Sequence, residues 1–91
     1  MPAWDIKFKN MTASLFTKEY ENFRKLIEKY RQKKNITQAE LAEKLNRPQS
    51  FVSKYENGER RLDVVEFLEI AKLLKINIPE FFRKIEAGDS D

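Results

Sequence analysis

Hydrophobic residues recur at helical spacing along most of the chain. Between residues 18 and 34, Tyr20, Phe23, Ile27 and Tyr30 follow one another every three or four positions, which places them on one face of a helix. The same spacing predicts four further helices, over residues 38–45, 49–57, 64–75 and 78–86. The pattern therefore predicts an all-α fold of five helices within residues 17–86.

Capping signals support two of these helix starts. Thr37 is followed three residues later by Glu40, and Asp63 is followed three residues later by Glu66. In such capping boxes each side chain bonds the other residue's backbone N–H, so both pairs predict helix starts. The Asn-Gly step that ends at Gly58 predicts a helix end, since glycine readily adopts a left-handed conformation.

The two ends of the chain do not follow the helical pattern. Trp4, Ile6 and Phe8 alternate with charged residues within the extension 1–16, which favours a short strand. A lone strand is not stable, so it would pack on the domain, pair with a second chain or stay mobile. Residues 87–91 form a short acidic tail.

Composition excludes several kinds of chemistry. The 91 residues include neither cysteine nor histidine, which rules out disulfides, thiolate nucleophiles and the usual zinc ligands, and we expect no cofactor. The first residues lack the apolar run of a signal peptide, so we expect a cytoplasmic protein. The net charge of +3 permits binding to nucleic acid without demanding it.

The predicted helix 49–57 has an unusual polar face. At about 100° per residue, its apolar side chains gather on one side and its polar side chains on the other. The polar arc contains no acid and consists of Gln49, Ser50, Ser53, Lys54 and Asn57. It could be ordinary solvated surface, but Gln, Ser and Asn also read base edges, and Lys meets guanine or phosphate.

The neighbouring elements favour the second interpretation. Helix 38–45, a three-residue turn and helix 49–57 match the helix-turn-helix arrangement, in which the second helix enters the major groove of double-stranded DNA. The first helix offers free backbone N–H groups to a phosphate, with Gln38 beside them. Three arginines flank the second helix and could contact the DNA backbone: Arg47, Arg60 and Arg61.

The stretch from residue 20 to residue 86 resembles the helix-turn-helix domain of the Cro and phage-repressor family, also called the XRE family. The resemblance rests on an arginine in the first helix, a Leu-Thr-Gln-like step, Glu-Leu-Ala, a small turn residue, Gln-Ser and a terminal Glu-x-Gly. In this chain these are Arg31, Ile36-Thr37-Gln38, Glu40-Leu41-Ala42, Asn46, Gln49-Ser50 and Glu56-Asn57-Gly58.

The resemblance implies a five-helix, lambda-repressor-like domain that binds a pseudo-palindromic operator as a dimer. Base edges would be contacted by Gln49, Ser50, Ser53 and Lys54. The DNA backbone would be contacted by Gln38, Arg47, Asn57, Arg60 and Arg61. By the same resemblance, Gln38 would also brace Gln49, while Arg31 and Glu56 would form an internal ion pair with a structural role.

Three departures from the family pattern accompany the resemblance. Asn46 stands where the family most often has glycine, which is a small change because asparagine tolerates the left-handed region. Pro48 replaces the usual Ser or Thr cap, so one phosphate-facing hydroxyl is absent. Lys75 occupies a position where a helix-ending glycine is common.

Three classes of function follow from the sequence. The first is a sequence-specific transcriptional regulator, for which a repressor is favoured. The alternative is an antitoxin or adaptor whose main partner is another protein, with Trp4, Ile6 and Phe8 as candidate contacts. An enzyme would need to use Ser50 and Lys54, one helical turn apart, but no third orienting group accompanies them, and we expect no enzymatic activity.

Overall fold

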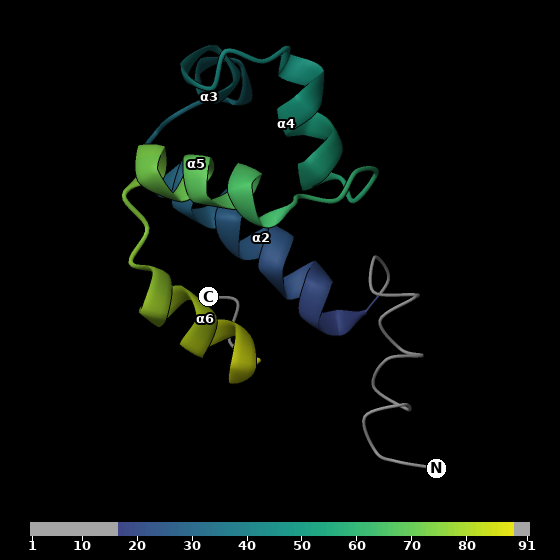
Figure 1. The fold of residues 1–91 in the computed structure, drawn as a ribbon, viewed down its shortest axis with the longest axis vertical. Helices are drawn as coiled ribbons and strands as arrows, with labels where there is room; N and C mark the ends of the chain where they lie inside the picture. Colours follow the sequence, from purple (N-terminus) through teal and green to yellow (C-terminus); the bar gives the residue numbers. More distant parts are fainter. Residues whose placement is uncertain (1–16, 89–91) are drawn as a thin grey trace.

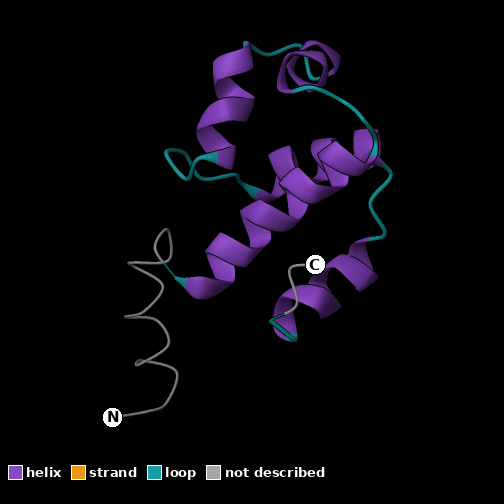
Figure 2. Cartoon of the chain, turned by 180° about the vertical axis from the view of Figure 1, so that it is seen from behind, coloured by secondary structure: helices purple, strands orange, loops and turns teal. Residues whose placement is uncertain are grey.

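The computed structural model describes residues 17–88, and this part of the chain consists of helices and loops (Figures 1 and 2). The helices are α2 (Lys18–Lys33), α3 (Gln38–Lys44), α4 (Gln49–Glu56), α5 (Val64–Leu74) and α6 (Ile78–Glu86). The predicted all-α fold is confirmed, with each of the first four helices ending one residue before its predicted end. The predicted strand in residues 1–16 lies outside the described residues.

Side-chain caps explain where α3 and α5 begin. Thr37 and Glu40 form a complete capping box at the start of α3, and Asp63 and Glu66 form another at the start of α5. Both boxes were predicted from residue spacing. Pro48 is the N-cap residue of α4 and makes no side-chain hydrogen bond there, as its chemistry requires.

Residues in the left-handed conformation end several helices. Asn35 and Asn46 follow α2 and α3 with φ of 57°, and Lys75 ends α5 with φ of 54°. Gly58 follows α4 with φ of 81°. Asn46 thus adopts the conformation expected for the glycine it replaces, whereas Lys75 does so despite a steric cost of roughly 1–2 kcal/mol for an L-residue.

The core lies where the apolar faces of the helices meet. Ile27, Val52, Ile70, Leu74 and Phe81 are each 0% exposed, and together they come from α2, α4, α5 and α6. Helix α3 packs against α4, while α2 packs against both α4 and α6. In Figure 1, α3 and α4 form one end of the molecule and α6 lies toward the other, so the helix-turn-helix pair is presented at one end.

An aromatic cluster attaches α6 to α2 and α5. The ring of Phe81 lies 5.1 Å from that of Phe67, 5.7 Å from that of Phe23 and 6.0 Å from that of Tyr30. Phe82, the next residue, is 42% exposed. Helix α6 therefore has one phenylalanine in the core and a second at the surface.

Candidate nucleic-acid interface

Backbone hydrogen bonds fix the turn between α3 and α4. The N–H of Asn46 donates to the carbonyl of Glu43 at 3.0 Å, and the N–H of Arg47 donates to the carbonyl of Ala42 at 3.0 Å. These bonds satisfy carbonyl groups that the end of α3 leaves free. Helix α3 points nearly along the line of sight in Figure 1 while α4 lies across it, so the two axes cross steeply, as in a helix-turn-helix.

The two sides of α4 differ as the sequence pattern predicted. Phe51 is 7% exposed, and Val52 and Tyr55 are 0% exposed, so the apolar side belongs to the core. The polar side remains accessible: Ser53 is partly exposed, and the exposed members of the arc are Gln49, Ser50, Lys54 and Asn57. Helix α4 thus presents hydrogen-bonding groups and one positive charge to solvent.

Glu56 connects three helices through buried hydrogen bonds. Its carboxylate accepts from Arg31 of α2 at 2.7 Å (Nε to Oε2) and at 3.0 Å (Nη2 to Oε1). The same Oε1 accepts from Nε2 of Gln38 of α3 at 2.8 Å. The Glu56 side chain is only 2% exposed, so Arg31 balances its charge and Gln38 adds a neutral hydrogen bond. The carboxylate also raises the pKa of Arg31.

The structure corrects one role that the resemblance had implied. Gln38 was expected to brace Gln49, but its side-chain amide donates to Glu56 instead. The physical reason is that a buried, ionised carboxylate is a stronger acceptor than a neutral, exposed amide. Gln38 is therefore held from inside the domain, at the point where α3 and α4 meet.

Arg24 is a residue that the sequence did not single out. Its Nη1 donates to the carbonyl oxygen of Glu56 at 2.6 Å, satisfying a group at the end of α4. A Cβ on Gly58 would lie 3.1 Å from Nε of Arg24, so glycine fits both the left-handed backbone and this close approach. The signal was absent from the sequence because the contact joins segments far apart in the chain.

Comparison with known proteins decides the family. A helix-turn-helix family model matches residues 27–81. Among solved structures, an XRE-family like protein from Pseudomonas syringae pv. tomato str. DC3000 is 42% identical and superposes with a TM-score of 0.74. The match covers 86% of this chain and 95% of that one. This chain belongs to the XRE family of helix-turn-helix proteins. None of the curated proteins compared with the chain matches it.

In this XRE-family domain, the flanking arginines make different contacts. The side chains of Arg47 and Arg60 are 35% and 39% exposed, and both approach Glu66 of α5. Arg61 is exposed, and its guanidinium carbon lies 5.6 Å from the ring centroid of Tyr20. All three arginines therefore keep part of their surface available, while aromatic rings or carboxylates restrain their positions.

Other site chemistries find no support in the described part of this XRE-family domain. Residues 17–88 contain no group of three acidic side chains placed to hold a metal ion. None of the described helices has the length and apolar character needed to span a bilayer. Ser50 and Lys54 are both exposed to solvent on the outer side of α4.

Proposed function

We propose that this protein is a sequence-specific regulator of transcription that acts as a repressor on double-stranded DNA. As a dimer it would bind a pseudo-palindromic operator, with α4 in the major groove of each half-site. The observation that carries the proposal is the exposed arc of α4, which is free of acids and flanked by Arg47 and Arg60. Membership of the XRE family supports the same class of function.

The residues of α4 and its flanks have distinct proposed roles. Gln49, Ser50, Ser53 and Lys54 would contact base edges, because their polar atoms lie on the accessible side of the helix. The contacts to the DNA backbone would come from Gln38, Arg47, Asn57, Arg60 and Arg61. Selection of DNA from a random pool with the purified protein tests this proposal, and recovery of no enriched, palindromic sequence would contradict it.

Replacing Gln49 with alanine should separate base reading from backbone binding. Gln49 is the first residue of α4, and glutamine pairs with adenine, so Gln49→Ala should lose about 1–3 kcal/mol on the selected operator. The affinity of the Gln49→Ala variant for scrambled DNA should stay nearly unchanged. Fluorescence anisotropy with both duplexes at one salt concentration measures the difference.

The matched control for this experiment is Arg61→Ala. A phosphate contact carries no sequence information, so this variant should weaken binding to operator and scrambled DNA by about the same factor. If Gln49→Ala behaves like Arg61→Ala on the two duplexes, the outer face of α4 only clamps the backbone, and the base-reading role is wrong.

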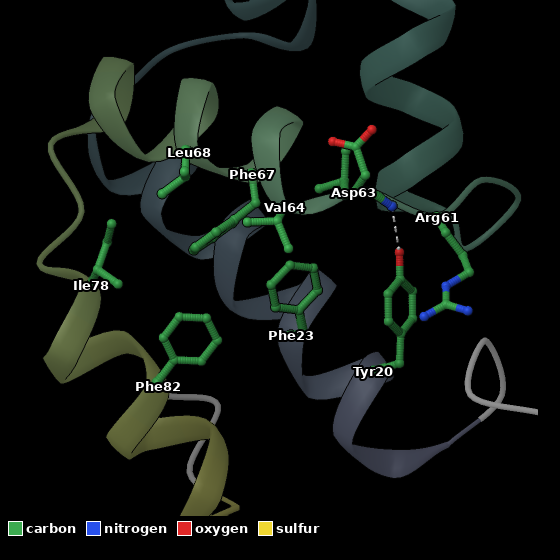
Figure 3. A pocket seen from close by; sticks show the side chains of 10 residues that line it. Tyr20, Phe23, Arg61, Asp63, Val64, Phe67, Leu68, Ile78 and Phe82 are labelled. Atoms are coloured by element: carbon green, nitrogen blue, oxygen red, sulfur yellow. Dashed lines mark hydrogen bonds between the residues drawn. The ribbon is translucent and has the colours of Figure 1, made fainter. Parts of the chain in front are cut away.

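A second surface supports the proposed dimer. An apolar hollow of about 300 Å³ lies between the first turns of α2, the first half of α5 and α6 (Figure 3). Phe82 and Leu68 line it, at 42% and 47% exposed, together with Val64 at 72%. Exposed apolar side chains that gather around a hollow mark an interaction surface, and we propose that a second copy covers it.

Replacing Phe82 with glutamate should therefore yield a monomer. A charge placed in the hollow would have to be desolvated when a partner covers it, and Phe82 lies outside the core, so helicity should be retained. Leu73→Glu is the matched control, because Leu73 is 37% exposed on α5 and does not line the hollow. Sedimentation of the two variants measures their oligomeric states.

The oligomeric states of the wild type and of Phe82→Glu also bear on the alternative function. A dimer that survives Phe82→Glu would place the interface elsewhere. A wild-type protein that is monomeric and does not bind DNA would instead favour an antitoxin or adaptor, for which the hollow in Figure 3 would receive another protein.

A further inference from the structure

Glu66 joins two of the arginines that flank α4. Its carboxylate accepts from Arg60 through both oxygens, at 3.0 Å (Nη1 to Oε1) and 2.8 Å (Nη2 to Oε2). Nη1 of Arg47 lies 3.8 Å from Oε2 of the same carboxylate. Arg47 belongs to the turn before α4 and Arg60 to the loop after it, so one side chain of α5 links both ends of α4.

The ring of Phe51 completes this cluster. The guanidinium carbons of Arg47 and Arg60 lie 4.5 Å and 4.7 Å from its centroid. Phe51 itself is 7% exposed, so it provides a fixed surface on which both guanidinium groups rest. Each arginine is thus positioned by an aromatic ring and a carboxylate together.

The capping box fixes the carboxylate in turn. Oε1 of Glu66 accepts from the backbone N–H of Asp63 at 3.0 Å, and the Glu66 side chain is 10% exposed. The Arg60 guanidinium holds the pKa of Glu66 below its ordinary value, so the side chain is ionised at neutral pH. The cluster contains two positive charges and one negative charge, and its formal net charge is +1 in place of +2.

We propose that Glu66 is a positioning residue that limits binding to non-cognate DNA. The inference rests on the proposed DNA-binding function and deepens it. Glu66 holds Arg60 in the position in which it would contact a phosphate of the operator. Its negative charge also offsets part of the charge of both arginines, which weakens their non-specific attraction to DNA of any sequence. Specificity then depends on an acid in α5 as well as on the base-reading residues of α4.

The test is Glu66→Gln, with Glu69→Gln as the matched control. Glutamine also serves at this position of a capping box, so the start of α5 is retained while the charge is removed. Glu69 is exposed on the same helix, and its replacement makes the same change in net charge. Affinity for scrambled and operator DNA is measured by fluorescence anisotropy over a salt series.

Glu66→Gln should bind scrambled DNA more tightly than the control, by about five- to tenfold at 0.1 M salt. The salt slope should become steeper by roughly 0.9 per subunit, because each subunit neutralises about one more phosphate. Operator affinity should rise less, so the specificity ratio falls. A merely structural role would lower both affinities, and that result, or one equal to Glu69→Gln, would overturn the proposal.

Two further measurements keep the inference separate from the proposed function. In the free protein, ¹⁵N relaxation of Arg60 Nε should show greater mobility in Glu66→Gln than in wild type, and equal mobility would overturn the positioning role without any DNA. Arg60→Lys keeps the charge but lacks the bidentate fork, so it should lower operator affinity with an unchanged salt slope. Wild-type protein that binds no DNA would overturn the proposed function itself, and with it this inference.

Discussion

Replacing Glu56 with alanine should lower the free energy of unfolding by about 3–5 kcal/mol, because the buried Arg31 charge would lose its closest carboxylate and keep only Glu28, at 3.9 Å, as an acidic neighbour. The side-chain amide of Gln38 would lose its hydrogen-bond acceptor as well, which adds to the destabilisation. For a domain of this size the melting temperature should fall by roughly 10 °C or more. Thermal melting followed by circular dichroism measures the change.

The control for this prediction is the exposed ion pair between Glu21 and Lys25 of α2. Its atoms are 2.9 Å apart, a distance similar to that in the buried pair, yet both side chains are well exposed. Glu21→Ala should therefore leave the melting temperature nearly unchanged. If Glu56→Ala melts no lower than Glu21→Ala, the buried Arg31–Glu56 pair contributes no more to the free energy of unfolding than an exposed pair does.

Affinity for DNA should fall about 10³- to 10⁵-fold when the salt concentration rises from 50 to 200 mM. This range applies if the dimer contacts about 6–10 phosphates, since each contact releases a counterion from the DNA. Arg47, Arg60, Arg61 and Lys54 supply positive groups for such contacts, and their side chains are all at least partly exposed. Fluorescence anisotropy at a series of salt concentrations measures the slope.

Removing one of these positive side chains tests whether the salt dependence of DNA affinity arises from their contacts with phosphates. Arg61→Ala should reduce the magnitude of the slope by roughly one for each phosphate contact that is lost. An affinity that does not respond to salt would contradict backbone binding and would favour a protein partner for this XRE-family domain.

Local signals in the sequence were sufficient to predict the helices. The capping boxes at Thr37 and Asp63 act within three residues, so their spacing alone locates the starts of α3 and α5. The same holds for the two sides of α4, because a period of 3.6 residues fixes which side chains share a face. The left-handed conformation of Asn46 was also predictable, because asparagine tolerates this region, and the structure confirms it.

Contacts between distant segments could not be predicted in this way. Glu66 was recognised as a capping residue, but its pairing with Arg60 and its approach to Arg47 depend on how α5 packs against the ends of α4. Gln38 was assigned to Gln49 by resemblance, whereas the packed domain offers it the stronger acceptor on Glu56. Side-chain partners of this kind are decided by tertiary geometry and local charge together.

The hydrogen bonds at Glu56 also affect how the domain would approach a ligand. Because Arg31 and Gln38 secure the end of α4 to α2 and α3, the helices that form the proposed surface are already ordered in the free protein. Little conformational entropy remains to be lost on association, so docking would be close to rigid. Differences in affinity between operators should then arise mainly in dissociation rates, with similar association rates for all of them.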